Sequence, residues 1–121
     1  MSNAAQAYAR TAQTIASPRE IEAQALLKAA RQLQDAVTKW DDNDSGLTAA
    51  LLFNRKLWSI FVSDAISDAN PEALSTRQNI ANIGIFVMAQ CAALQIKPEI
   101  DKLQALIDIN SNIAAGLSGR V

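Results

Sequence analysis

Few side chains in this sequence could carry out chemistry. The 121 residues include no histidine and a single cysteine, Cys91. Sites that use a histidine as base or metal ligand are therefore excluded. Cys91 falls on the apolar side of a helical pattern, where a lone thiol usually fills space in a core. The four glycines are scattered and form no phosphate-binding loop. We therefore expect neither an enzyme nor a cofactor or metal site.

Two asparagines, Asn54 and Asn110, stand where the apolar pattern of their segments calls for hydrophobic residues. One interpretation is a pair of buried amides that hydrogen-bond across two helices and fix their register. The other is a polar contact to a bound segment of a partner. The pattern favours the buried pair and leaves the contact open.

The basic residues give only a weak signal for nucleic-acid binding. The net charge is −1, and the one adjacent basic pair is Arg55-Lys56, with Arg77 as the next candidate. RNA sites usually combine a basic groove with aromatic side chains that stack on the bases. A solvated surface is therefore the favoured interpretation of these three cations.

The elements that would position these residues are helices. Half of the residues are hydrophobic, with only four glycines and three prolines, and apolar residues recur every three or four positions. We predict an all-α, up-down bundle of four long helices joined by short connections. The predicted helices cover residues 18–40, 47–68, 75–97 and 98–117, in a single domain of residues 17–121. Residues 1–16 are predicted to be an N-terminal arm or a further short helix.

Three of these helices have recognisable start signals. The motif Ser17-Pro18-Arg19-Glu20 is typical of an N-cap, a first helical proline and a capping box. Ser75-Thr76-Arg77-Gln78 predicts a second capping box, and Pro98 is placed as the first residue of the last helix. Trp58 lies on the apolar stripe of the second helix and is predicted to be in the core.

The third helical segment is the most apolar, with no charged residue between Arg77 and Lys97. Several Asn and Gln side chains interrupt it, which argues against a membrane-spanning helix. Its apolar residues extend beyond one stripe, so we expect this helix in the middle of the bundle, covered on several faces. Gly84 is predicted to lie at a close helix crossing. There, alanine should relieve the cost of about 1 kcal/mol that glycine brings to a helix.

Some apolar residues lie outside the stripes, such as Ile60 in the second helix and Phe86 in the third. They either complete the core, the favoured interpretation, or line a groove for a partner helix with basic residues on its rim. The candidate partner-binding residues are Phe53, Asn54, Arg55, Lys56, Ile60, Arg77, Asn79, Asn82, Ile85 and Phe86.

Four blocks, spread over nearly the whole chain, carry a recognisable pattern. They are Tyr8 to Ser17-Pro18-Arg19-Glu20, Asn54-Arg55-Lys56-Leu57-Trp58, Arg77-Gln78-Asn79-Ile80-Ala81-Asn82, and Ile107-Asp108-Ile109-Asn110 to Leu117. Together they resemble the FlaF family of alphaproteobacterial flagellar biosynthesis regulators. The second and third blocks are the most specific.

The resemblance implies a small cytoplasmic protein, not an enzyme, that supports flagellin production and assembly after transcription. Its implied partner is flagellin, whose terminal segments form coiled-coil helices in the filament and would be held by a chaperone before export. A FlbT-like regulator of the same pathway is a further implied partner. Two alternatives stay open: an RNA-binding regulator of flagellin message, and an adaptor that binds the FlbT-like regulator instead of flagellin.

Overall fold

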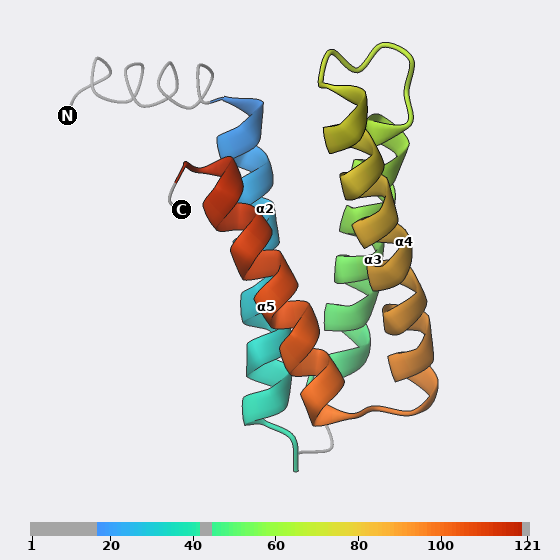
Figure 1. Ribbon diagram of the computed structural model, residues 1–121. Coiled ribbons are helices and arrows are strands. Elements are labelled where there is room, and N and C mark those ends of the chain that lie inside the picture. The colour runs from blue at the N-terminus through green and yellow to red at the C-terminus, as the bar shows by residue number, and fades with distance from the viewer. Residues whose placement is uncertain (1–16, 42–44, 120–121) are drawn as a thin grey trace, which may run out of the picture.

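The described part of the chain folds into a bundle of four long helices, as predicted (Figure 1). A computed structural model describes residues 17–41 and 45–119, and the predicted arm of residues 1–16 lies outside the described residues. The helices are α2 (Pro18–Thr38), α3 (Leu47–Ala65), α4 (Leu74–Ile96) and α5 (Ile100–Leu117). Consecutive helices run in opposite directions, which confirms the up-down topology.

The signal for the start of α2 is confirmed. Ser17 is the N-cap, and its Oγ accepts a hydrogen bond from the Glu20 backbone N–H at 3.1 Å. Pro18 is the first helical residue, where its missing N–H costs no hydrogen bond.

Five other predicted boundaries are wrong by one to three residues: the end of α2, the end of α3, both ends of α4 and the start of α5. Helix α4 begins at Leu74, one residue before the predicted capping box. Its N-cap is Ala73, so no side chain caps this helix. Helix α5 begins two residues after Pro98, because Lys97 and Glu99 are both extended. Helix α3 ends at Ala65, before residue 68, and its last carbonyls accept side-chain hydrogen bonds: that of Asp64 from Asn70 in the following loop, and that of Ala65 from Arg77 in α4.

The helices pack as two pairs. Helix α2 lies along α5 and α3 lies along α4, whereas α4 and α5 contact each other least. Figure 1 shows the pairs separating towards the end where α4 begins and α5 ends. The expectation that the third helix lies in the middle of the bundle, covered on several faces, is therefore wrong: α3 alone covers most of its buried face.

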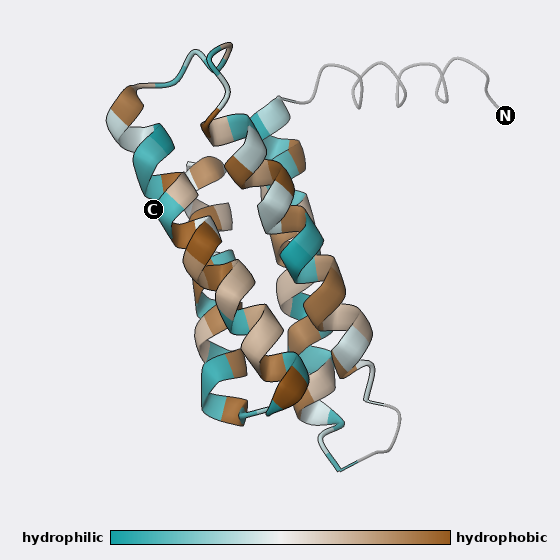
Figure 2. Cartoon of the chain, turned by 90° about the vertical axis from the view of Figure 1, so that its right-hand side faces the viewer, coloured by the Kyte–Doolittle hydropathy of each residue, from teal (hydrophilic) through white to brown (hydrophobic). Residues whose placement is uncertain are grey.

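Helix α4 is the one described helix that is long and apolar enough to cross a membrane. Only Gly84, Val87, Cys91 and Leu94 on it are buried, and these four face the bundle. Much of its remaining apolar surface is exposed, including Phe86 (50%) and Ile85 (60%). Figure 2 shows hydrophobic residues along all four helices. The apolar excess of α4 therefore belongs largely to its outer faces.

Trp58 is fully buried at the centre of the core, as predicted. Its ring meets Phe61 edge to face, with 5.3 Å between the ring centroids. Gly84 of α4 packs directly on this region, which confirms the predicted close crossing. A Cβ at Gly84 would lie 3.2 Å from Trp58 Cε3 and would clash with Val62 Cγ2. The expectation that alanine would relieve strain is therefore wrong, because its methyl group has no space.

Candidate functional site

A chain of buried hydrogen bonds crosses the core. Trp58 Nε1 donates to Asn110 Oδ1 at 2.8 Å, and Asn110 Nδ2 donates to Asn54 Oδ1 at 2.6 Å. Asn54 Nδ2 then donates to Cys91 Sγ at 3.2 Å. Both asparagines are fully buried, so the buried-pair interpretation is confirmed. In this conformation Asn54 cannot reach a partner.

The thiol of Cys91 belongs to this buried chain and is unsuited to nucleophilic chemistry. Burial raises its pKa, and the hydrogen bond from Asn54 opposes that shift less strongly. The protonated thiol is a poor nucleophile. In residues 17–41 and 45–119, no group of three His, Cys, Asp or Glu side chains is placed to hold a metal ion.

Arg77 turns towards the end of α3 instead of the solvent. Its Nε donates to the Ala65 carbonyl at 2.7 Å, and its terminal nitrogen donates to the Ser67 carbonyl at 2.8 Å. These carbonyls lie at or just beyond the C-terminus of α3, where no further helical turn binds them. Arg77 is therefore a structural residue that joins the start of α4 to the end of α3.

One end of the bundle is hollowed by a cleft of about 530 Å³. We call it the end cleft. It lies where α2 and α4 begin and α3 and α5 end. Its apolar lining consists of Pro18, Trp58, Phe61, Ala65, Ile80, Pro71, Ile113 and Leu117, and its polar lining of Ser17, Arg19, Glu22, Asp64, Asn70, Glu72, Thr76 and Arg77. An apolar floor with a charged rim suits a segment that carries both kinds of side chain.

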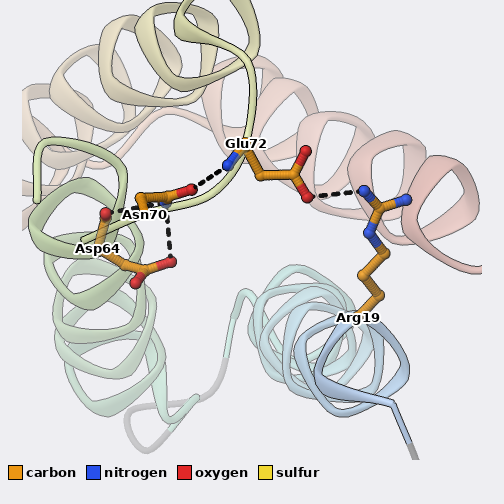
Figure 3. Close-up of polar contacts among 4 residues, drawn as sticks. All are labelled: Arg19, Asp64, Asn70 and Glu72. Atoms are coloured by element: carbon orange, nitrogen blue, oxygen red, sulfur yellow. Dashed lines mark hydrogen bonds and ion pairs between the residues drawn. The ribbon is translucent and has the colours of Figure 1, made fainter. Parts of the chain in front are cut away.

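The rim of the end cleft is ordered by polar contacts (Figure 3). Arg19 of α2 reaches across to Glu72, with 2.8 Å between its terminal nitrogen and Glu72 Oε1. Asn70 Oδ1 accepts from the Glu72 backbone N–H at 2.8 Å, and its Nδ2 donates to the Asp64 carbonyl at 3.0 Å. Asn70 therefore ties the loop after α3 to the end of that helix.

A second hollow, of about 390 Å³, runs between α4 and α5. We call it the α4–α5 groove. It is lined by Asn82, Ile83 and Phe86 from α4 and by Ile109, Asn112 and Ile113 from α5. Ile113 lines both this groove and the end cleft, so the two are neighbours. The groove exists because α4 and α5 are each packed against another helix.

The structure does not bring the predicted partner-binding residues together in one groove. Asn82 and Phe86 lie in the α4–α5 groove. Ile85 projects from a different side of α4, because successive helical residues are about 100° apart. Phe53 lies by α2, with Lys28 Nζ 5.3 Å from its ring centroid.

The other predicted residues are on the surface or inside. Arg55, Lys56, Ile60 and Asn79 are exposed and line neither hollow. Asn54 is buried, and Arg77 lines the end cleft.

Sequence reasoning missed the end cleft and its rim residues, above all Arg19, Asn70 and Glu72. Arg19 belongs to the clear capping motif, but its contact with Glu72 spans 53 positions of sequence. The one available signal was that the N-cap at Ser17 and the turn at residues 70–71 fall at the same end of an up-down bundle.

Comparison with known protein families decides the relationship. The model of the family described as "Flagellar protein FlaF" matches residues 4–117. This chain belongs to the FlaF family. No curated protein and no solved structure that was compared matches it.

The four blocks that resembled FlaF meet at the end cleft. The first contributes Ser17, Pro18 and Arg19, and the second contributes Trp58. The third contributes Arg77 and Ile80, and the fourth contributes Ile113 and Leu117. The third and fourth blocks also face each other across the α4–α5 groove. Each of the four blocks therefore contributes residues to the end cleft, and the second and fourth also contribute Asn54, Trp58 and Asn110 to the buried hydrogen-bond chain.

Proposed function

We propose that this FlaF-family protein is a non-enzymatic cytoplasmic chaperone that binds flagellin and promotes its production and export. In this proposal, an apolar-faced helix of flagellin lies in the α4–α5 groove before export. Helix-in-groove binding places the apolar side of one helix into a hydrophobic surface groove. The flagellin segment would be a coiled-coil helix whose apolar face is not yet covered by another helix.

The observation that supports this proposal most is the open seam between α4 and α5. The two helices contact each other least of the neighbouring pairs, and Phe86 stands half exposed on the groove between them. Ile83, Ile109 and Ile113 make the groove apolar, while Asn82 and Asn112 supply polar contacts. An aromatic side chain in such a position is the usual anchor of a protein interface.

The test uses two adjacent substitutions on α4. Phe86→Asp puts a charge into the groove, whereas Ile85→Asp puts the same charge on another side of the helix. Because both residues are at least half exposed, we expect both variants to keep the helicity and melting temperature of the wild type. Phe86→Asp should lose flagellin in co-purification from a nuclease-treated extract, and Ile85→Asp should retain it.

The outcomes separate the alternatives. Equal flagellin recovery with both variants would remove the α4–α5 groove from the proposal. Loss of partner binding on nuclease treatment would instead favour an RNA-binding regulator. The arrangement of cations gives that alternative little support, because Arg77 is engaged at the end of α3, away from Arg55 and Lys56. Recovery of a FlbT-like regulator without flagellin would favour the adaptor.

A further inference from the structure

We propose that the end cleft is the docking site of the chain's own N-terminal segment, residues 1–16. In this arrangement Tyr8 and Ile15 enter the apolar floor and Arg10 faces the acidic rim. The inference rests on the geometry and charge of the end cleft. It does not require flagellin binding in the neighbouring α4–α5 groove.

The first argument is where the segment joins the described structure. Ser17 and Pro18 line the end cleft, so the preceding chain leaves from its border. Ser17 is extended, with φ −65° and ψ 150°, so the helical path of α2 ends at this residue. The chain from Tyr8 to Ser17 would be about 14 Å long as a helix or roughly 30 Å long when extended. Either conformation allows Tyr8 to reach the cleft.

The second argument is charge. Glu22, Asp64 and Glu72 all line the end cleft, and among the described residues only Glu72 has an ion-pair partner, Arg19. Burial raises the pKa of Glu22, and the nearby Asp64 carboxylate adds to this shift. The lining also holds the cations Arg19 and Arg77, and Arg19 partly opposes the shift at Glu22, so the cleft carries one more acidic than basic side chain and favours one further cation. Residues 1–16 contain Arg10 and no acidic residue.

The third argument is the match of apolar side chains. Trp58, Phe61, Ile80, Ile113 and Leu117 form the floor of the cleft. In residues 1–16, Ala5, Tyr8, Ala12 and Ile15 recur at helical spacing and would share one face. Alanines between the two larger side chains allow close approach to the rim. A volume of about 530 Å³ is within the range that takes several side chains.

Docking of this segment would also affect the neighbouring groove. Ile113 lines both hollows, so a side chain packed on it from the end cleft restricts one wall of the α4–α5 groove. The FlaF match begins at residue 4 and therefore includes most of the segment. Residues 1–16 would thus be a built-in part of the bundle that influences the groove.

A spin label on the N-terminal segment tests the proposal in the full chain. Cys91→Ser supplies a background without other thiols and keeps an acceptor for Asn54 Nδ2. A nitroxide is attached at Gln6→Cys, a position about 200° around a helix from Tyr8, and methyl signals are recorded by NMR. We expect broadening of Ile80, Ile113 and Leu117 but not of Ile96 and Ile100, which are the last residue of α4 and the first of α5 and so lie at the other end of the bundle.

Three comparisons make the result decisive. Tyr8→Ala and Arg10→Glu should each reduce the broadening, whereas Tyr8→Phe should preserve it. Equal broadening at both ends of the bundle, no broadening, or no effect of Tyr8→Ala would overturn the proposal. So would broadening in a mixture of spin-labelled and isotope-labelled chains, because the segment would then dock on a second copy. Since flagellin is absent throughout, failure of the proposed function would leave this result unchanged.

Discussion

Asn110 Nδ2 donates a hydrogen bond to Asn54 Oδ1 over 2.6 Å, joining α5 to α3 in a fully buried site. The two residues are 56 positions apart in the sequence. Trp58 and Cys91 extend the contact on either side, and no buried side-chain nitrogen or oxygen atom of the described residues lacks a partner. A polar core of this kind is favourable because every member is satisfied.

Removal of one asparagine should leave its partners unsatisfied. Asn110→Leu deprives the Trp58 N–H of its acceptor and the Asn54 amide of a donor, at roughly 1–3 kcal/mol for each unsatisfied group. The measurement is the free energy of unfolding from urea titration. The double variant Asn54→Leu/Asn110→Leu should cost less than the sum of the two single variants. Additive costs would show that the two amides are not coupled.

Trp58→Ala should destabilise the fold by roughly 3–5 kcal/mol, the usual cost of truncating a large buried side chain. Trp58→Phe keeps much of the volume and loses the hydrogen bond to Asn110, so it should cost less than Trp58→Ala. Both are compared by thermal and urea unfolding. A Trp58→Ala protein that melts with the wild type would contradict the placement of Trp58 in the core.

Gly84→Ala should destabilise, although alanine is the better helix former. The added methyl group would meet Val62, a β-branched residue that has few alternative rotamers in a helix. Overpacking of this kind typically costs about 1–3 kcal/mol. Gly116→Ala is the matched control, because a Cβ there has no atom within 4 Å. The control should gain up to about 1 kcal/mol from helix propensity. If both variants changed the free energy of unfolding in the same direction, α3 and α4 would be farther apart at Gly84 than the structure shows.

Arg77→Ala should lower stability, because it leaves the carbonyls of Ala65 and Ser67 without their side-chain donors. A hydrogen bond to a charged group contributes about 1.5–3 kcal/mol. Arg77→Lys should restore only part of the loss, since one ammonium group does not reproduce the guanidinium fork. Unfolding of the two variants and the wild type by urea checks the order. A loss of partner binding at unchanged stability would instead give Arg77 a direct role at the interface.

The sequence alone determined the four helices, the up-down topology and the inward positions of Trp58, Asn54 and Asn110. These features follow from local periodicity and caps, because a residue on an apolar helical stripe faces the core whichever helix covers it. The FlaF relationship was also visible in the sequence, in blocks whose residue types and order are distinctive.

Tertiary structure decided which helices cover one another. Periodicity shows that α4 is apolar on several sides, but the pairing of α2 with α5 and of α3 with α4 leaves Phe86 and Ile85 exposed. The packing of α3 on α4 also reverses the expected effect of Gly84→Ala. Helix propensity is a local property of the sequence, whereas the clash with Val62 comes from another helix. The end cleft has the same origin. Arg19 and Glu72 meet only when helix ends that are distant in sequence are brought together by packing.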